Sequence, residues 1–429
     1  MARRLNAADP GFRDAYSALI KQRGERLDSV EAGVRAIVEA VRREGVDAVL
    51  RFTKEFDGLA LNTADLRVSE AQRKRARAEC APETVKALEA AAERVLAFHA
   101  RQIPDDAQWT DEAGVTLGWR WRAVDSAGLY APGGLAAYPS SVLMNALPAK
   151  AAGVKRLVMA TPPARIHENP AILAAADVAG IEEIWAIGGA QAVAALAYGA
   201  GDLSACDVVV GPGNAYVAAA KKIVFGDVGI DAIAGPSEVF IVADATAPPA
   251  WLAADLLAQA EHDADAQSVL FTDSAELADA VAREVERSIA AGEAGASAGE
   301  SWSRHGAIVL VARLEDAAPL IDQAAPEHAQ LAMEKPERLT NLITHAGALF
   351  LGANTPEALG DYVAGPSHVL PTGRAARFAS GVSVMTFLKR TTLIGASAGA
   401  VSAVGPDAAR LADAEGLPAH ARSVRLRLE

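Results

Sequence analysis

Apolar positions recur along this chain at two periods, which separate helical stretches from strand-rich ones. Residues 30–56 place an apolar side chain every three or four positions, and this spacing predicts amphipathic helix. A longer helical pattern with a charged outer face covers residues 70–103, where Pro82 is a candidate break. Apolar and polar residues alternate over residues 115–130, so we expect strands there that lead into a new domain.

Residues 131–224 repeat a short apolar strand, a glycine turn and an alanine-rich helix. Two units, EEIWAIGGAQAVAALAYG and CDVVVGPGNAYVAAAKKIV, resemble each other, and turns of this kind direct helix N–H groups at a phosphate. Gly211 and Gly213 form a G-x-G, but Tyr216 occupies the third glycine position of the dinucleotide fingerprint. Ordinary strand-to-helix turns, with Asn214 as an N-cap, therefore stay open as the alternative to half of a dinucleotide site.

Residues 234–263 combine a turn, a buried strand and a helix with polar residues on one face. Gly235 and Pro236 predict the turn, and the sequence VFIVAD predicts a short buried strand after it. In the helix that follows, Gln259 and His262 lie three positions apart and therefore on one face. The same pattern continues downstream, with strands expected at 268–272 and 307–311 and a helix at 275–291.

Composition narrows the class of protein. The chain has 429 residues, about half of them hydrophobic, which is enough for two or more domains with full cores. A net charge of -13 and a pI near 5.2 argue against nucleic acid or an anionic membrane as the main partner. Cys80 and Cys206 are far apart, which favours two buried thiols in a reducing compartment over a disulfide or a thiolate zinc site. No apolar run approaches membrane-spanning length, so we expect a cytoplasmic protein.

Further chemistry-bearing residues follow Pro326. Glu327 and His328 are adjacent acid–base groups that no core pattern requires, and both can serve one site only if the backbone there is irregular. The motifs DYVAGPSHVLP (361–371) and EGLPAH (415–420) each pair a carboxylate with an imidazole. Four of the eight histidines thus lie in compact motifs beside an acidic residue: His262, His328, His368 and His420.

These clusters contain the nitrogen and oxygen ligands expected of a catalytic zinc. A helical ligand pair, an aspartate and a distant histidine would make up such a set, although a single histidine is more often structural. Gln259 is the unusual member, because hydrogen bonding is the default role of a glutamine side chain.

Five of the motifs also point to one family. GPSEVFIVAD, LLAQAEHDADAQ, PEHAQL, GDYVAGPSHVLPT and EGLPAHARSVRLR, together with LYAPGG, GGAQAVAALAYG and GPGNA, resemble histidinol dehydrogenase from about residue 23 to the C-terminus. This resemblance implies a zinc-dependent enzyme that oxidises L-histidinol to L-histidine through L-histidinaldehyde, using two NAD+. That reaction is the last step of histidine biosynthesis.

The resemblance also assigns roles to individual residues. It implies that Glu327 and His328 are catalytic, with His328 as the base for the hydroxyl proton and Glu327 activating the water that hydrates the aldehyde. It makes Gln259 a metal ligand on family grounds. The implied zinc ligands are Gln259, His262, Asp361 and His420. The implied substrate contacts are Ser237, Gln259, His262, His328, Asp361, His368, Glu415 and His420, and the implied NAD+ contacts are Tyr130, Gln191 and Asn214.

The expected architecture is α/β, with two incomplete Rossmann-like domains, an N-terminal helical arm and a small swapped C-terminal tail. We expect residues 129–237 to bind NAD+, and the tail to follow GASAGAVSAVG, a small-residue connector that would equally suit a plain loop. In the family this tail completes the zinc site of a partner subunit, so the resemblance implies a domain-swapped homodimer. The remaining expected units are an arm of residues 1–24, a domain of residues 25–128 with 238–380 that carries the metal and catalytic residues, and the tail of residues 381–429.

One departure from the family pattern leaves an alternative substrate open. The turn before His368 is Gly365-Pro366-Ser367 rather than the Thr-Asn or Pro-Asn expected of other members. A paralogous zinc and NAD+ dehydrogenase acting on another small alcohol, such as a sulfonated diol, is the alternative, and the presence of Glu415 and His368 argues against it. The presence of both Glu327 and His328 likewise argues against a non-catalytic zinc scaffold.

Overall fold

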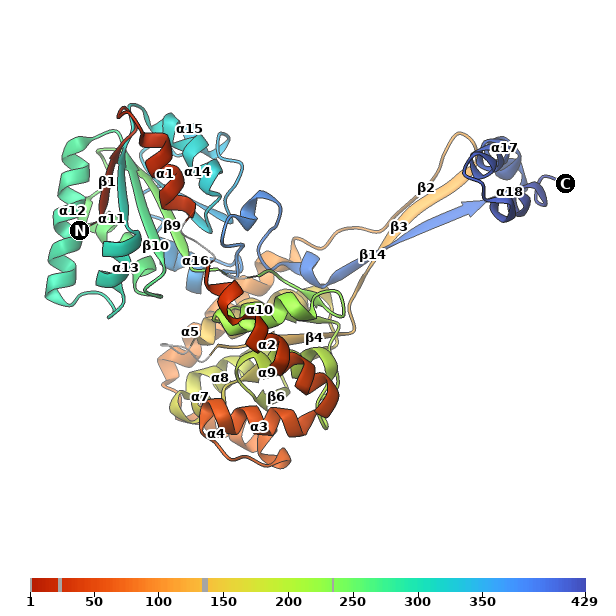
Figure 1. Ribbon diagram of the computed structural model, residues 1–429, viewed down its shortest axis with the longest axis horizontal. Helices are drawn as coiled ribbons and strands as arrows, with labels where there is room; N and C mark the ends of the chain where they lie inside the picture. The colour runs from red at the N-terminus through yellow and green to blue at the C-terminus, as the bar shows by residue number, and fades with distance from the viewer. Residues whose placement is uncertain (1, 22–24, 133–137, 234) are drawn as a thin grey trace.

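The computed structural model describes residues 2–21, 25–132, 138–233 and 235–429, which form two parallel sheets and one long arm (Figure 1). Six strands make the first sheet, in the order β1-β11-β10-β9-β12-β13, and five make the second, in the order β6-β5-β4-β7-β8. A third, antiparallel sheet of β14, β3 and β2 forms the arm. The predicted α/β class with two Rossmann-like parts is confirmed.

Helices cover both faces of the six-stranded sheet, so its central strands are apolar along most of their length. β9 (Glu238–Ala243) and β10 (Gln267–Thr272) are buried at every position. One face packs on α11 (Pro249–Ala260), α12 (Ala275–Ala291) and α13 (Ala298–His305), and the other on α1 (Phe12–Lys21) and α14 (Ala318–Ala324). The strands and the helix predicted between residues 268 and 311 are confirmed. The other elements here are β1 (Arg3–Asn6), β11 (Ala307–Leu310), η2 (Leu314–Ala317), β12 (His328–Ala332), α15 (Glu337–Thr340), β13 (Ala348–Leu351), α16 (Glu357–Tyr362) and η3 (Ala375–Arg377).

The five-stranded sheet has the strand order of a Rossmann half. In chain order its strands are arranged 3-2-1-4-5, and the direction of winding reverses between β4 (Ser126–Tyr130) and β7 (Val208–Val210). Its remaining elements are α6 (Pro139–Ala152), β5 (Arg156–Thr161), α7 (Pro163–Glu168), α8 (Pro170–Ala179), β6 (Glu183–Ala186), α9 (Gly189–Tyr198), α10 (Ala215–Val224) and β8 (Gly229–Ile230).

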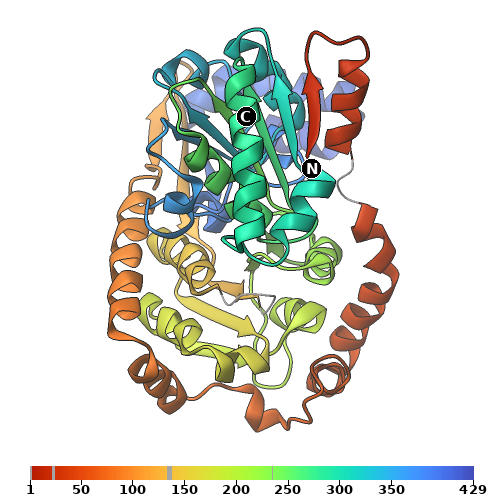
Figure 2. The same ribbon diagram turned by 90° about the vertical axis from the view of Figure 1, so that its left-hand side faces the viewer.

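The helices of residues 25–100 wrap around this second sheet rather than the first (Figure 2). Val34 and Val41 pack in one cluster with Trp185 and Leu196, whereas residues 25–128 were expected to join residues 238–380. An amphipathic pattern identifies the face of a helix that is buried, but not the sheet that buries it. The elements are α2 (Glu25–Glu44), α3 (Val46–Asp57), η1 (Thr63–Leu66), α4 (Glu70–Glu79) and α5 (Pro82–Ala100), so the break at Pro82 is confirmed.

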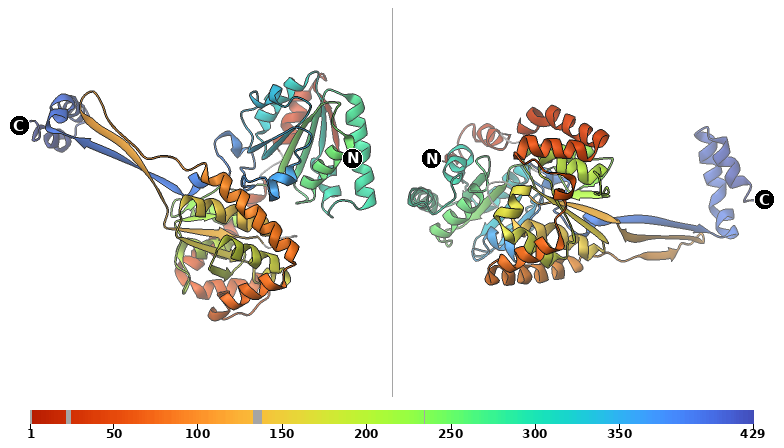
Figure 3. Two further views of the ribbon diagram at one scale, coloured as in Figure 1. Left: turned by 180° about the vertical axis from the view of Figure 1, so that it is seen from behind. Right: turned by 90° about the horizontal axis from the view of Figure 1, so that it is seen from below.

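The arm projects away from both domains and ends in two helices (Figure 3). Its strands are β2 (Ala107–Thr110), β3 (Val115–Ala123) and β14 (Leu388–Ala396), and η4 (Val384–Phe387) precedes the last of them. The prediction of a connector at residues 395–405 is wrong, because α17 (Ala398–Ala414) covers most of this segment. Helix α18 (Pro418–Arg425) follows α17. Ser397 caps α17 by accepting from Ala400 N, and the alanines after it favour helix.

In the part of the chain that the structure describes, no helix is both long and apolar enough to cross a lipid bilayer. Residues 133 and 134 of the LYAPGG motif, and Ala234 at the start of the 234–263 segment, lie outside the described residues.

Candidate active site

The first half of the site lies where β4 and β7 end. Tyr130, the last residue of β4, is buried, and its hydroxyl accepts a hydrogen bond from Gly189 N at 3.0 Å, at the start of α9. Burial raises the pKa of Tyr130 to about 12, so the phenol is neutral. Gln191, in the first turn of α9, has a buried Oε1 without a partner among the described residues. Asn214 Oδ1 accepts from Tyr216 N and Val217 N, so Asn214 is the N-cap considered above.

A buried ion pair fixes the turn after β7. Gly211 has a φ of 125°, and a Cβ there would lie 2.2 Å from Tyr130 O, so only glycine fits. Lys221 Nζ donates to Gly211 O at 2.9 Å, while Gly211 N donates to Asp231 Oδ2 at 2.9 Å. Lys221 and Asp231 are themselves 2.5 Å apart, and their side chains are 2% and 4% exposed. The pair thus holds both polar main-chain groups of Gly211.

The second half of the site lies where β9 and β12 begin. Glu238 is the first residue of β9, and His328 is the first residue of the neighbouring strand β12. Glu238 and Glu327 bind each other's main-chain N–H groups reciprocally, at 3.1 and 3.2 Å. The backbone is irregular just before this point, since Ala325 has a φ of 46°. Glu327 and His328 can therefore both face the site.

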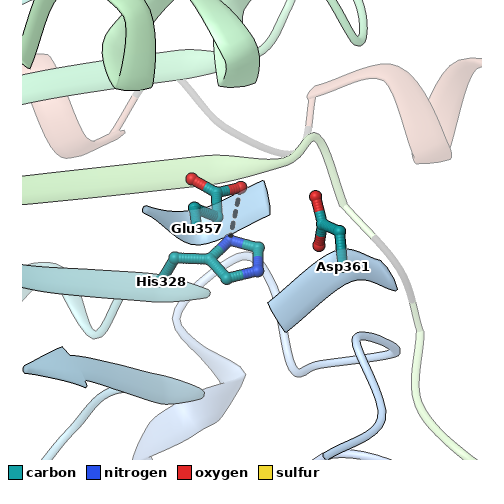
Figure 4. A group of neighbouring side chains, drawn as sticks. All are labelled: His328, Glu357 and Asp361. Atoms are coloured by element: carbon teal, nitrogen blue, oxygen red, sulfur yellow. Dashed lines mark ion pairs between the residues drawn. The ribbon is translucent and has the colours of Figure 1, made fainter. Parts of the chain in front are cut away.

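Helix α16 adds two carboxylates beside the histidine. His328 Nδ1 lies 3.4 Å from Glu357 Oε1, and potential ligand atoms of His328, Glu357 and Asp361 lie within 4.8 Å of one another (Figure 4). Burial, then the neighbouring Asp361, Glu327 and Asp255, raise the pKa of Glu357 well above its usual value. Glu357 is not among the site residues expected from the sequence. Its position four residues before Asp361, on the same face of a helix, was the signal that could have found it.

Gln259 is buried against the same carboxylate. With its amide nitrogen turned toward Glu357, Gln259 donates to both carboxylate oxygens, one of them at 3.1 Å, and accepts from Glu238 N at 3.3 Å. In the opposite orientation, Gln259 Oε1 faces only acceptors and Nε2 faces the N–H of Glu238, another donor. A cation between the oxygens would satisfy the first of these contacts.

Three histidines share one hydrogen-bonding arrangement in this cluster. In each, Nδ1 lies within 3.0 Å of a main-chain carbonyl oxygen, which can only accept, so Nδ1 carries the proton and Nε2 presents a lone pair. Burial lowers the pKa of His328 to about 4 and also lowers the pKa of His368, which keeps both rings neutral. The pairs are His262 with Ala258 O, His328 with Glu238 O and His368 with Asp361 O.

These donors suit a divalent transition metal. His328 Nε2 is buried without a partner among the described residues, and the imidazole, carboxylate and amide groups described above gather in the same site. The candidate metal cluster in the structure consists of His328, Glu357 and Asp361. It shares only Asp361 with the zinc ligands that the family resemblance implies. Gln259, in the last turn of α11, and His262, two residues beyond the end of this helix, lie at the edge of this group. The Tyr138 ring is stacked 6.4 Å from the ring of His262.

Glu415 and His420 lie elsewhere. Both are exposed residues of the α17 and α18 region, at the far end of the arm from the cluster (Figure 1). Ser237 lies next to Glu238, and His368 lies within reach of Ser141 on α6. The structure therefore brings the other expected site residues to two neighbouring places and leaves these two outside.

Comparison with known proteins identifies the family. The sequence profile described as histidinol dehydrogenase matches residues 20–428. The histidinol dehydrogenase of Rhodopseudomonas palustris is 53% identical over 428 residues, covering 100% of this chain and 99% of the relative. The chain belongs to the histidinol dehydrogenase family. The enzyme of Caulobacter vibrioides is 50% identical over 99% of both chains.

A solved structure supports the assignment. The crystal structure of histidinol dehydrogenase from Elizabethkingia anophelis matches with a TM-score of 0.91 and 35% identity, covering 100% of this chain and 98% of that one. The chain is thus an oxidoreductase of this family.

Proposed function

We propose that this enzyme oxidises L-histidinol to L-histidine in two successive two-electron steps through L-histidinaldehyde, reducing two NAD+. The observation that carries the proposal is the meeting of a neutral, buried His328 with Glu327 beside the donors Gln259, His262 and Asp361. Family membership supports L-histidinol as the substrate and the last step of histidine biosynthesis as the reaction.

His328 would act as the general base of the alcohol oxidation. Its Nδ1–H is held by Glu238 O, so the lone pair that can accept the hydroxyl proton is on Nε2, the atom without a partner among described residues. Its lowered pKa keeps the ring unprotonated at neutral pH. The carbon that bears this hydroxyl would lose a hydride to the nicotinamide ring of NAD+.

Glu327 would serve the second step. Hydride can leave the aldehyde carbon only after water has added to it, because the carbon must become tetrahedral. The Glu327 carboxylate lies 3.7 Å from His328 Nδ1 and accepts a hydrogen bond from Glu238 N. This position supports its proposed role as the base that activates the water. His328 would then remove the proton of the hydrate.

Zn²⁺, one per subunit, is proposed at Gln259, His262 and Asp361, with His420 of the partner subunit as the fourth ligand. When bound, it would hold the imidazole and amine of the substrate in the reacting geometry. The proposed substrate contacts are Ser237, His328, His368 and Glu415, in addition to the four ligands. The proposed NAD+ contacts are Tyr130, Gln191 and Asn214.

The position of the arm supports a domain-swapped homodimer. Glu415 and His420 are exposed far from the cluster of their own chain, and Leu411 and Ile394 on the arm are 66% and 75% exposed. Docking of this arm on a second copy would bury the apolar side chains and complete the partner's site. Two free, buried cysteines suit the cytoplasm as the compartment.

The reaction is tested by counting NADH formed per L-histidinol consumed, before and after chelation. We expect about two NADH per substrate, loss of activity on chelation and recovery with Zn²⁺. A folded, zinc-loaded protein that turns over other primary alcohols, but not L-histidinol, would favour the paralogous dehydrogenase.

The swapped arm is tested by co-expressing Glu327→Gln and His420→Ala chains, each expected to be inactive alone. A mixed dimer contains one intact site if the arm crosses between subunits, so we expect about a quarter of wild-type activity from random pairing. No recovery in a verified mixed dimer would contradict the swap.

A further inference from the structure

Helix α6 contains a proline in its interior, which leaves one buried carbonyl without its usual donor. In an α-helix the carbonyl of Met144 accepts the N–H of residue 148, but residue 148 is Pro148 and has no N–H. The Ser367 hydroxyl donates to Met144 O at 3.0 Å in its place, and both residues are buried. A side chain 223 positions away thus replaces the missing helical hydrogen bond.

Ser367 also fixes the backbone on both sides of His368. Its Oγ accepts from Val369 N at 3.2 Å while donating to α6, so the hydroxyl has both a donor and an acceptor role. Ser141 makes a second contact one turn away on α6, with its Oγ 3.2 Å from His368 Nε2. Because Nδ1 carries the ring proton, Ser141 donates in that bond.

The helix involved connects the two halves of the site. α6 begins nine residues after Tyr130 at the end of β4, and Asp361 lies on α16, which follows β13 of the six-stranded sheet. Between Asp361 and His368 the chain crosses to α6, since Val363 and Val369 pack against the core that contains this helix. Ser367 therefore ties the loop that carries His368 to the part of the molecule proposed to bind NAD+.

We propose that Ser367 is a positioning residue, whose hydroxyl occupies the carbonyl that Pro148 leaves open in α6 and so holds His368 at the substrate site. The proposal rests on the proposed histidinol activity for its kinetic consequence, but the contact itself is independent of that activity. It predicts that Ser367 affects the binding of the alcohol substrate and leaves the binding of NAD+ unchanged.

The test is Ser367→Ala, with KM measured for L-histidinol and for NAD+. We expect KM for L-histidinol to rise by about fivefold to tenfold, as for loss of one neutral hydrogen bond, with KM for NAD+ unchanged. Ser301→Ala is the matched control, because Ser301 is also buried and donates to a main-chain carbonyl, Ala266 O, at 2.9 Å in the six-stranded part. Equal KM changes in the two variants, or no change in Ser367→Ala, would overturn the proposal.

Pro148→Ala examines the origin of the contact. The new N–H would compete with Ser367 for Met144 O, so we expect a smaller rise in KM for L-histidinol, and Ser367→Ala should add little in this background. Full additivity of the two changes would contradict the coupling.

A readout without turnover separates this proposal from the proposed reaction. The His368 ring signals in a histidine-selective NMR spectrum, assigned with His368→Gln, should shift in Ser367→Ala and stay in place in Ser301→Ala. If the wild-type enzyme fails to oxidise L-histidinol, the proposed function fails, while unshifted His368 signals would overturn the positioning role by itself.

Discussion

The two parallel sheets share a strand order but offer opposite ends to the site. In chain order β4 to β8 are arranged 3-2-1-4-5, and so are β9 to β13, with β1 added at one edge. The five-stranded sheet presents the carboxyl ends of β4 and β7, where Tyr130 and Gly211 lie. The six-stranded sheet presents the amino ends of β9 and β12, where Glu238 and His328 lie. Strand order alone therefore does not decide where a ligand binds.

The charge of the proposed ligands explains the difference. Helices begin at the carboxyl ends of parallel strands, and the N-termini of α9 and α10 offer partial positive charge to a dinucleotide phosphate. Helices end at the amino ends of strands, and Gln259 and His262 occupy the C-terminal end of α11, where partial negative charge favours a cation. Each sheet offers the end whose helix termini match its proposed ligand.

The buried charges differ in the same way. In the five-stranded part, Asp231 has its cation within the chain, Lys221. In the six-stranded part, burial and three neighbouring carboxylates all raise the pKa of Glu357. The buried carboxylate of the five-stranded part is thus neutralised within the chain, whereas the carboxylates of the six-stranded part would be stabilised by an added cation.

Replacing His328 should have the largest effect, and it should change catalysis at the six-stranded sheet without changing NADH binding at the five-stranded sheet. His328→Gln removes the proposed base, so we expect kcat to fall by about 10²-fold to 10⁴-fold. NADH affinity, measured by fluorescence titration, should stay at the wild-type value, because the carboxyl-end half is untouched. Equal loss of NADH binding would show that the two ends do not act separately.

Replacing Lys221 should instead affect the five-stranded part, through its stability and its binding of NADH. Lys221→Met leaves Asp231 buried without its partner, so the free energy of unfolding in urea should fall by about 3–5 kcal/mol. NADH binding should weaken because Gly211 loses a contact that holds its turn. Adding Asp231→Asn should restore much of the stability.

Lys222 is the matched control for this variant. It is the next residue along α10, and its ion pair with Glu31 is exposed. Lys222→Met should leave unfolding and NADH binding unchanged. An equal loss from both lysine variants would contradict a special role for the buried pair.

The sequence predicted the elements that have clear local boundaries. The helix expected at 275–291 has those bounds because Ser274 caps its start and Gly292 ends it in the left-handed region. The prediction of a connector at GASAGAVSAVG is wrong, because the alanines of this segment favour helix and Ser397 provides its N-cap.

Contacts between distant segments could not be predicted from local sequence patterns. The helices α2 to α5 have a buried face in any arrangement, so their sequence does not select the sheet that covers it. Motifs could suggest Glu327 and His328 as a pair, whereas the only local signal for Glu357 is its position four residues before Asp361 in a short helix. The contact of Ser367 with Met144 joins segments far apart in the chain, and no periodicity encodes it.

His99 provides the smallest effect and sharpens the comparison, because this buried imidazole belongs to neither ligand site. Its Nδ1 bonds Gln102 Oε1 at 2.7 Å, and its Nε2 is buried without a partner among the described residues. Burial lowers the pKa of His99 below 6.5, so below that pH the unfolded chain binds the proton more readily and stability falls as pH falls. His99→Gln should reduce the difference in unfolding free energy between pH 7.5 and 5.5 by less than about 1 kcal/mol, measured in urea, with kcat and both KM values unchanged. An unaltered pH dependence of stability would mean that His99 can take up a proton without leaving its buried position.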